Sequence, residues 1–287
     1  MILKILAAPL LLYRVFFKKW ADWQELKFQG EISKRLPIDK TAHFFPELPN
    51  KRAAIRNALQ FMGYKFEIGW KANSVNFAWH DETIKQLESS NVNAFNIKCN
   101  NISKSFLDQI HLEVFGYGLT VNPLQAKGKI LEKSEQNGKH DAKIIKAPCH
   151  AKSGYVYQKI IDTRKTLFYE DIRPVVIGSE ILMVYLNYRL AGKRFSAKKI
   201  KATLAKAADH LSDNEQKQII ELCSKMGADI AELDILRDRH NGKIYVVDIN
   251  PTAFGPAHGL SLNEKLNAIR IYSEGLEKQI NLTKGNS

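Results

Sequence analysis

The sequence predicts an α+β fold, in which helices and hairpins of antiparallel strands occupy separate segments of the chain. Two hairpins are indicated by Asn-Gly turn signals, at Asn137-Gly138 and at Asn241-Gly242. A capping box, Ser212-x-x-Glu215, opens a helix that leads into the second hairpin. The chain has 287 residues, of which 45% are hydrophobic and 25% charged, and is long enough for one large or two modest globular domains.

The first predicted unit, residues 1–93, is a divergent N-terminal region of mixed α and β character. It opens with the run MILKILAAPLLLYRVFFKKW, which is too short to span a bilayer and lacks a convincing signal-peptide cleavage site. This run predicts a basic amphipathic helix, which either packs on its own protein or lies on an anionic membrane surface. Apolar periodicity predicts a second helix at 51–62, and aromatic and Val/Ile residues favour strands within 64–79.

The second predicted unit, residues 94–160, carries two strand lysines. In chain order we expect a strand at 94–99, a helix at 104–114 capped by Ser103, hairpin strands at 129–133 and 142–146 around a loop at 134–140, and an extended segment at 154–161. Lys98 lies in the first of these strands, and Lys133 ends the first hairpin strand. Each lysine is either a solvated edge residue or a ligand of one shared phosphate chain.

The third predicted unit, residues 161–287, carries a charged strand pair and an acidic hairpin. In chain order we expect paired strands at 167–177 and 180–188, a lysine-rich loop at 193–206, a helix at 212–226, hairpin strands at 229–237 and 243–249, and a terminal helix at 263–279. Asp171 and Arg173 share one face of the first strand, since side chains alternate along a strand, and Arg189 follows the second.

The register of the acidic hairpin decides which side chains it brings together. A two-residue Asn241-Gly242 turn would pair Ile235 with Asp248 and put Asp234 on the opposite face. A three-residue loop, His240-Asn241-Gly242 with Gly242 left-handed, pairs Asp234 with Asp248. We predict the three-residue loop, because it gathers the polar residues on one face of the hairpin.

Under this register Glu232 also pairs with Asn250, while apolar side chains occupy the other face. These apolar residues are Leu233, Ile235, Val247 and Ile249. Carboxylates gathered in this way repel each other unless a positive group lies between them, and hard oxygen ligands suit Mg²⁺. The alternative is that Asp248 and Asn250 merely end a strand and begin a loop.

The net charge of +13 implies either an anionic partner or a basic surface kept soluble by self-repulsion. Aromatic residues are not interleaved with basic ones as a single-strand nucleic-acid platform requires, so no nucleic-acid partner is expected. The three cysteines, Cys99, Cys149 and Cys223, show no metal-ligand spacing. They indicate reduced thiols in a cytoplasmic setting.

Taken in order, the strand lysine, helix, hairpin lysine, connecting strand, charged strand pair and acidic hairpin resemble the ATP-grasp superfamily. The likeness covers residues 94–259, and its most specific part is LDILRDRHNGKIYVVDIN, residues 233–250, followed by a loop of small residues. It implies two α+β lobes with ATP between them. Residues 94–160 would form the nucleotide-binding lobe and residues 161–287 the C-terminal lobe that carries the metal site.

The resemblance also implies a role for each candidate site residue. These roles are phosphate binding by Lys98 and Lys133, adenine recognition by the backbone of a hinge that includes Gln158, Lys159 and Ile160, ribose binding by Asp171, action near the phosphates or the substrate by Arg173 and Arg189, and coordination of Mg²⁺, or Mn²⁺ in its place, by Asp234, Asp248 and Asn250.

The activity that the resemblance implies is that of an ATP- and Mg²⁺-dependent ligase. A substrate carboxylate would attack the γ-phosphate to give an acylphosphate, which an amine or thiol then displaces. The partners would be ATP, a small-molecule or peptide carboxylate and an amine acceptor. The expected location is the cytoplasm, with peripheral membrane contact through the N-terminal helix as a further expectation.

Three departures from the family pattern leave alternatives open. Asp248 stands where the family more often has Glu, and the phosphate-covering loop has the single glycine Gly138. Glu232 stands where many relatives carry a basic residue, so it orients Arg173 or Arg189, or binds an amine. The alternatives are a catalytically silent ATP-binding protein and a basic module that binds nucleic acid or a membrane surface.

Overall fold

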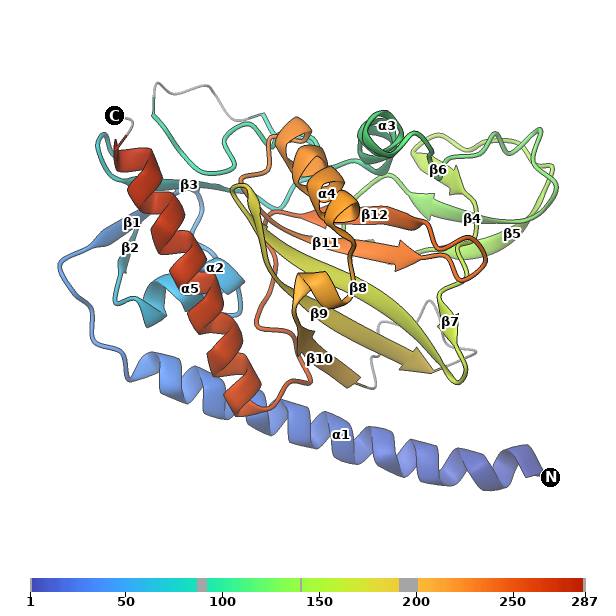
Figure 1. Cartoon of the computed structure of the whole chain (residues 1–287), viewed down its shortest axis with the longest axis horizontal. Helices are drawn as coiled ribbons and strands as arrows, with labels where there is room; N and C mark the ends of the chain where they lie inside the picture. Colours follow the sequence, from blue (N-terminus) through green and yellow to red (C-terminus); the bar gives the residue numbers. More distant parts are fainter. Residues whose placement is uncertain (1, 87–91, 140, 191–200, 286–287) are drawn as a thin grey trace.

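The computed structural model describes residues 2–86, 92–139, 141–190 and 201–285, with side chains described between Phe16 and Thr283. Three sheets follow one another across the molecule: an N-terminal three-stranded sheet, a central six-stranded sheet and a small three-stranded sheet (Figure 1). Helices pack beside these sheets, and both hairpins and the parallel N-terminal strands are present. The predicted α+β fold class is confirmed.

The N-terminal region is built around a parallel sheet with the strand order β2-β1-β3. Its elements are α1 (Ile2–Ser33), β1 (Thr41–Pro46), α2 (Ala54–Phe61), β2 (Lys65–Ile68) and β3 (Val75–Trp79). The predicted helix at 51–62 and the strands within 64–79 are confirmed, whereas β1 lies outside the predicted strands. No helix in the part of the chain that the structure describes is long and apolar enough to cross a membrane.

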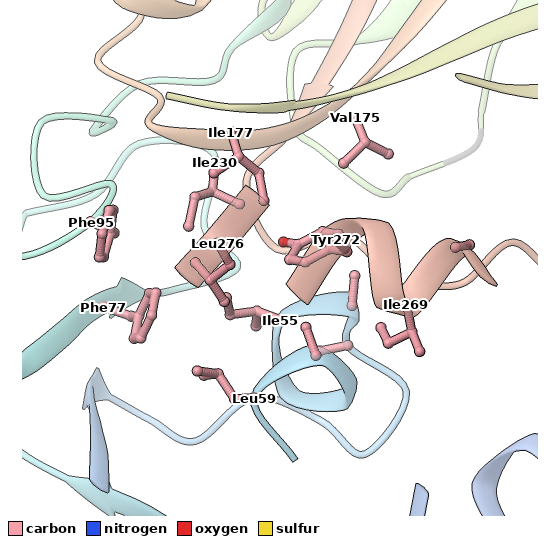
Figure 2. Close-up of a cluster of buried hydrophobic side chains, with 14 of the residues drawn as sticks. Ile55, Leu59, Phe77, Phe95, Val175, Ile177, Ile230, Ile269, Tyr272 and Leu276 are labelled. Carbon is pink, nitrogen blue, oxygen red and sulfur yellow. The ribbon is translucent and has the colours of Figure 1, made fainter. Parts of the chain in front are cut away.

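The terminal helix α5 (Leu262–Gly285) returns to the N-terminal region and packs on α2 and α1. Figure 2 shows side chains of α5, such as Tyr272 and Leu276, between Ile55 of α2 and residues of the central sheet, such as Ile177. All four of these side chains are at most 5% exposed. One hydrophobic core therefore joins the first and last parts of the sequence.

The middle of the chain forms the small antiparallel sheet, with the strand order β5-β4-β6. Its elements are α3 (Lys104–Phe115), β4 (Gly128–Ser134), β5 (Lys143–Ala147) and β6 (Tyr155–Gln158). The Ser103 hydroxyl accepts the backbone N–H of Phe106 at 3.4 Å, which confirms the predicted cap of α3. The predicted hairpin around the loop at 134–140 is also confirmed.

The strand predicted at 94–99 is wrong. Phe95 forms only an isolated bridge with Phe77, and the next three residues form a turn with Asn96 at φ 60°. The Asn96 side chain exchanges hydrogen bonds with the backbone of Ile230, and its N–H donates to the Asp229 carboxylate at 2.6 Å. These side-chain contacts take the place of a strand ladder, as Asn favours.

The rest of the chain forms the central sheet, whose strand order is β10-β9-β8-β11-β12, with β7 pairing to β8. The elements are β7 (Arg164–Lys165), β8 (Phe168–Ile177), β9 (Glu180–Leu190), β10 (Lys201–Ala205), the 3-10 helix η1 (Ala207–Asp209), α4 (Asp213–Lys225), β11 (Ile230–Arg237) and β12 (Ile244–Asn250). The predicted strand pairs and the capping box of Ser212 and Glu215 are confirmed.

One face of the central sheet forms a second hydrophobic core with α3 and α4, which includes Leu233 and Ile249 of the acidic hairpin. The prediction of a loop at 193–206 can be compared with the structure only in part, because residues 193–200 lie outside the described part of the chain. Residues 201–205 form β10 and pair with β9, so the prediction is wrong for them.

Candidate active site

The acidic hairpin brings its polar residues together as expected. Asp234 pairs with Asp248, and Glu232 pairs with Asn250. Side chains of directly opposed residues in an antiparallel pair have Cβ atoms about 5 Å apart, so the two aspartates are close neighbours. The predicted register is therefore confirmed at these positions.

The predicted three-residue loop is nevertheless wrong. The N–H of Asp238 donates to the carbonyl of Lys243 at 2.9 Å, so the loop comprises residues 239–242, and Ile235 pairs with Val246. A register shift between Asp234 and Ile235 leaves Val247 as an extra residue in β12. This β-bulge, and not the loop, returns the two aspartates to the same face.

The bulge also changes the surroundings of Val247. Its carbonyl oxygen accepts a hydrogen bond from Lys133 Nζ at 3.3 Å, so β4 of the small sheet contacts β12 of the central sheet here. Its side chain packs with Tyr245 and Leu119, apart from the core of Ile235. The expectation that Val247 shares a face with Ile235 is wrong, because a bulged residue interrupts the alternation of the strand.

Lys133 and Asp248 are ionisable groups held in a largely buried place. Burial is the main reason why the pKa of Lys133 is lowered to about 8, and the neighbouring Asp248 opposes this shift. Burial, and after it repulsion from Asp234, raise the pKa of Asp248 to about 6. One carboxylate oxygen of Asp248 is buried and accepts no hydrogen bond from the described residues.

Lys104, the first residue of α3, is a basic residue of this site that sequence reasoning missed. Like Asp248, it acts electrostatically on Lys133, and its Nζ donates to the carbonyl oxygens of Glu135 at 3.4 Å and Gln136 at 3.0 Å in the loop after β4. The signal was its place directly after the N-cap Ser103, since the first turn of a helix faces whatever binds at the helix end.

The predicted phosphate ligand Lys98 is not brought into this group. It is exposed and acts electrostatically on Asp229, while its carbonyl lies against Gly227 at the end of α4. A Cβ atom on Gly227 would lie 2.5 Å from that carbonyl oxygen. Lys98 therefore takes part in packing the turn before α3 on the end of α4, and Lys104 is the lysine that lies near Lys133.

Arg173 is bound by two carboxylates of the hairpin. Its guanidinium donates to Glu232 at 2.8 Å and to Asp234 at 2.5 Å. Burial by itself would lower the pKa of Arg173, but Asp234 and Glu232 together raise it, so the side chain stays charged. Of the alternatives for Glu232, the structure shows an ion pair that orients Arg173.

The second predicted arginine, Arg189 of β9, forms an ion pair with Asp171 of β8. Both side chains are mostly buried, and Asp234 also acts on Arg189, which places the pair beside Arg173 on the same sheet. Burial lowers the pKa of Arg189. The roles predicted for Asp171 and Arg189 toward a nucleotide or substrate stay predictions.

Asn250 ends β12 and begins the following loop. Its Oδ1 accepts the backbone N–H of Thr252 at 3.0 Å and the Thr252 hydroxyl at 3.2 Å. The same hydroxyl lies 3.2 Å from Asp81, a residue of the N-terminal region that sequence reasoning did not single out. The hydrogen bonds of Asn250 are therefore those of a residue that begins a loop, as the alternative prediction states. Through the Thr252 hydroxyl, a third acid, Asp81, also lies near the hairpin.

The predicted hinge lies between the small and central sheets. Gln158 is buried between Leu131 and Thr120, and the N–H of Lys159 donates to the carbonyl of Leu119 at 3.0 Å, so these backbone groups are engaged with β4 and with the segment before it. Ile160 forms no hydrogen bond with another backbone group in the described ranges. The same holds for the carbonyl of Lys159, so the predicted role of the hinge backbone in adenine recognition stays a prediction for these groups.

A cavity of about 240 Å³ lies beside the hairpin on the side of the N-terminal region. Its charged lining residues are Glu25, Arg52, Arg173 and Glu232. Asn250 and the loop that follows β12 complete the wall, including the exposed Phe254. A cavity with both arginine and glutamate in its wall suits a small polar substrate of either charge or of both.

The residues present fit a divalent cation bound together with phosphates. Asp248 offers an unpaired buried oxygen, and its opposition to Asp234 is the arrangement that a cation relieves. Within the described ranges, no three His, Cys, Asp or Glu side chains are close enough to hold a metal alone. A cation held here by Asp234, Asp248 and Asn250 would thus depend on phosphate oxygens for its remaining ligands, as Mg²⁺ commonly does.

No protein-family model matches the sequence, and no curated protein matches it. Solved structures share its fold. The D-alanine–D-alanine ligase from Bacillus anthracis aligns with a TM-score of 0.53 at 13% identity, over 86% of this chain and 99% of the ligase. The same enzyme complexed with ATP aligns with a TM-score of 0.52 at 15% identity, with the same coverage of both chains.

The ATP-grasp ligase PsnB, complexed with a precursor peptide and AMPPNP, aligns with a TM-score of 0.50 at 11% identity, over 84% of this chain and 99% of PsnB. The chain spans 63% of PsnB in its complex with a phosphomimetic variant of the minimal precursor, Mg and ADP, at a TM-score of 0.46. It spans 58% of PsnB in the complex with the minimal precursor, at a TM-score of 0.43.

Proposed function

The chain has the ATP-grasp fold, and from this premise we propose that it is an ATP- and Mg²⁺-dependent ligase. It activates a carboxylate as an acylphosphate and joins it to an amine or thiol. The observation that carries this proposal is the meeting of Lys133 of β4 and Lys104 of α3 with Asp234 and Asp248 of the central sheet. Two cations facing two carboxylates suit a nucleotide triphosphate bound with its metal.

In this proposal each side chain has a task set by its charge and place. Lys133 and Lys104 bind the phosphate oxygens, and the hinge backbone at Lys159 and Ile160 binds the adenine edge. Asp234, Asp248 and Asn250 hold Mg²⁺, which when bound neutralises charge on the β- and γ-phosphates. Catalysis then consists of positioning and charge neutralisation, because phosphoryl transfer needs little covalent chemistry from the protein.

The acid and its acceptor enter through the cavity lined by Arg52 and Arg173. Arg173 is held by Glu232 and Asp234, so its guanidinium is fixed in place and positions a carboxylate or the γ-phosphate that it attacks. The mixed charge of the cavity supports substrates that carry a carboxylate, an amine or both.

The loop after β4 supports a second candidate, an ATP-binding protein without turnover. Lys104 and the N–H of Ser105 are engaged by Glu135 and Gln136 of this loop, which has Gly138 as its single glycine. Release of ADP separates the two candidates. Turnover that depends on an added acid and amine supports the ligase, and tight binding without turnover supports the second candidate.

The matched lysines of β4 test the nucleotide site. Lys133→Met removes a buried ammonium and should weaken Mg²⁺·ATP binding by about 10- to 100-fold, the value of a charge-assisted hydrogen bond. Lys129→Met changes an exposed lysine of the same strand and should leave binding nearly unchanged. Binding is measured by calorimetry and by the rise in melting temperature that a native-state ligand causes.

Two results would contradict this assignment. Equal loss of affinity in both variants would show that Lys133 is not the phosphate ligand. A folded wild-type protein whose melting temperature does not change with millimolar Mg²⁺·ATP would contradict nucleotide binding altogether. A screen of ADP release across carboxylic acids and amines then identifies the substrates.

A further inference from the structure

Helix α1 has one face that packs on the protein. The side chains of this inner face are buried: Ala21, Gln24, Phe28 and Ile32. Gln24 accepts the backbone N–H of Leu262 at 2.7 Å, and Phe17 lies against Gly259, where a Cβ atom would approach its ring to 3.0 Å. From residue 17 onward the helix is therefore fixed to the loop that follows the acidic hairpin and to the start of α5.

The opposite face of α1 is exposed and carries large apolar side chains. Their exposed fractions are 67% for Phe16, 39% for Trp20, 50% for Trp23 and 73% for Leu26. With Lys19 and Lys27, these side chains form the outer face of α1. At about 100° per residue, all six lie within about 120° around the helix axis.

Charge is divided between the two sides of the helix. Lys19 and Lys27 are exposed on the outer face, and Lys27 Nζ lies 3.6 Å from the centre of the Trp23 ring. The neighbouring acids are engaged on the side of the protein: Asp22 with His258 at 3.1 Å and Glu25 with Lys265 at 2.6 Å. Within the described ranges, no acid forms an ion pair with Lys19 or Lys27, so the outer face combines aromatic rings with unpaired positive charge.

The same helix continues to Ile2 at the periphery of the molecule (Figure 1). Residues 2–15 of the sequence are apolar apart from Lys4, Tyr13 and Arg14. Aromatic residues and lysines on one side of a helix are typical of helices that lie in the interface of a membrane and do not cross it. Lysines beside an anionic surface add attraction that salt screens.

We propose that α1 holds the protein on anionic lipid bilayers, with its outer face in the headgroup region. The charge of the outer face and the net charge of +13 are complementary to anionic lipid headgroups. The opposite side of α1 contacts the loop after β12. Binding in this way therefore places the candidate active site on the side of α1 that faces away from the bilayer.

The test uses the full chain and two kinds of vesicle, one of phosphatidylcholine alone and one of phosphatidylcholine and phosphatidylglycerol in equal amounts. We expect cosedimentation with the anionic vesicles, weakened by salt and independent of ATP. Lys19→Gln with Lys27→Gln should reduce partitioning by roughly 25-fold, because each lysine near an anionic surface contributes about fivefold. Trp20→Ser with Trp23→Ser should abolish the blue shift of tryptophan fluorescence on vesicle binding.

A matched pair of exposed leucines provides the control. Leu26→Ser on the outer face should weaken vesicle binding, whereas Leu112→Ser on α3 should not; these leucines are 73% and 52% exposed. Equal binding to both vesicles, equal effects of the two leucine variants, or no vesicle binding would overturn the proposal. A dimer that sediments as such in solution and is lost in the tryptophan variant, without vesicle binding, would assign the face to a second copy of the chain. ADP release in vesicle-free solution tests the ligase proposal separately.

Discussion

Asp248 lies where its ionised form is unfavourable in the absence of a bound cation. Burial and the facing Asp234 raise its pKa to about 6, whereas an unfolded chain has a pKa near 3.9 at this residue type. The folded protein therefore binds this proton more tightly than the unfolded chain does. At pH values above the pKa of Asp248 in the folded protein, the ionised carboxylate lowers the free energy of unfolding. This loss of stability disappears as the pH falls below the pKa of the unfolded chain.

Asp248→Asn should therefore stabilise the protein near neutral pH while removing a metal ligand. We expect the free energy of unfolding to rise by about 3 kcal/mol at pH 7, and the difference from wild type to vanish as the pH falls from 6 to 4. Mg²⁺·ATP should no longer raise the melting temperature as we expect it to in the wild type. Urea unfolding across this pH range, with and without Mg²⁺·ATP, measures both effects.

Asp209→Asn, which changes an exposed aspartate, is the control and should alter neither quantity. If Asp248→Asn instead loses stability at pH 7, the carboxylate of Asp248 makes stabilising contacts in the folded protein, and its role as an unpaired ligand for a cation is contradicted.

Residue types and spacing predicted the carboxylates of the site better than its lysines. Asp234 and Asp248 could be placed because a strand alternates faces, so register alone decides which side chains meet. Lys98 seemed equivalent to Lys133 only as long as residues 94–99 were a strand. The Asn96 side chain and its contacts with residues 229–230, more than a hundred positions away, decide that turn. Lys104 was missed because the orientation of α3 depends on the same packing.

At the scale of elements, the acidic hairpin was predicted correctly at the site and wrongly at its loop. The Asn-Gly signal located the turn, but the loop has four residues and Val247 bulges out of β12. The longer loop shifts the register of the hairpin by one residue, and the bulge shifts it back by one. The two changes together leave Asp234 paired with Asp248, as expected. A bulge cannot be recognised from apolar alternation alone, and here it points the Val247 carbonyl at Lys133.

Two glycines with the same backbone conformation test the packing of α4. Gly227 and Gly242 have φ of 70° and 71°, so alanine is strained by about 1–2 kcal/mol at either position. An added Cβ has open space at Gly242, whereas at Gly227 it would meet the Lys98 carbonyl at 2.5 Å. We expect Gly242→Ala to cost only the conformational strain and Gly227→Ala to cost clearly more, measured by urea unfolding.

The comparison of these two variants isolates the contact with Lys98. Equal losses of stability would mean that the backbone at Lys98 moves freely away from Gly227, and that the turn before α3 is not fixed by α4. Because α3 carries Lys104, a larger loss at Gly227 should also be accompanied by weaker Mg²⁺·ATP binding, and Gly242→Ala should leave this binding unchanged.

At the scale of the whole molecule, the chain closes on itself in a way that local patterns did not indicate. The terminal helix was predicted at 263–279, but an amphipathic pattern does not name the surface that it covers. In the structure α5 fills the space between the N-terminal and central sheets, so residues such as Ile55 and Tyr272 share one core (Figure 2). The cavity beside Arg173 likewise combines distant parts of the sequence, since Glu25 and Arg52 face the loop at 254–258 across it.

A buried ion pair joins these ends. Lys265 of α5 is fully buried, and its Nζ lies 2.6 Å from the Glu25 carboxylate of α1 and within hydrogen-bonding distance of the carbonyls of Pro256 and Ala257. Burial lowers the pKa of Lys265, and Glu25 opposes that shift. Removing one partner of a buried pair costs more than replacing the buried charge with an apolar group of similar shape.

Glu25→Ala should therefore destabilise the protein by about 3 kcal/mol or more, because it leaves a buried ammonium without its carboxylate. Lys265→Met should cost about 1 kcal/mol, since Glu25 is 18% exposed and can be hydrated. The double variant should be more stable than Glu25→Ala alone, because the unpaired ammonium is then absent.

Urea unfolding should show a single transition in each protein if the shared core makes the N-terminal region and the central sheet unfold together. A double variant no more stable than Glu25→Ala would mean that the ammonium is not the source of the loss, and separate transitions would show that α5 does not couple the two ends of the chain.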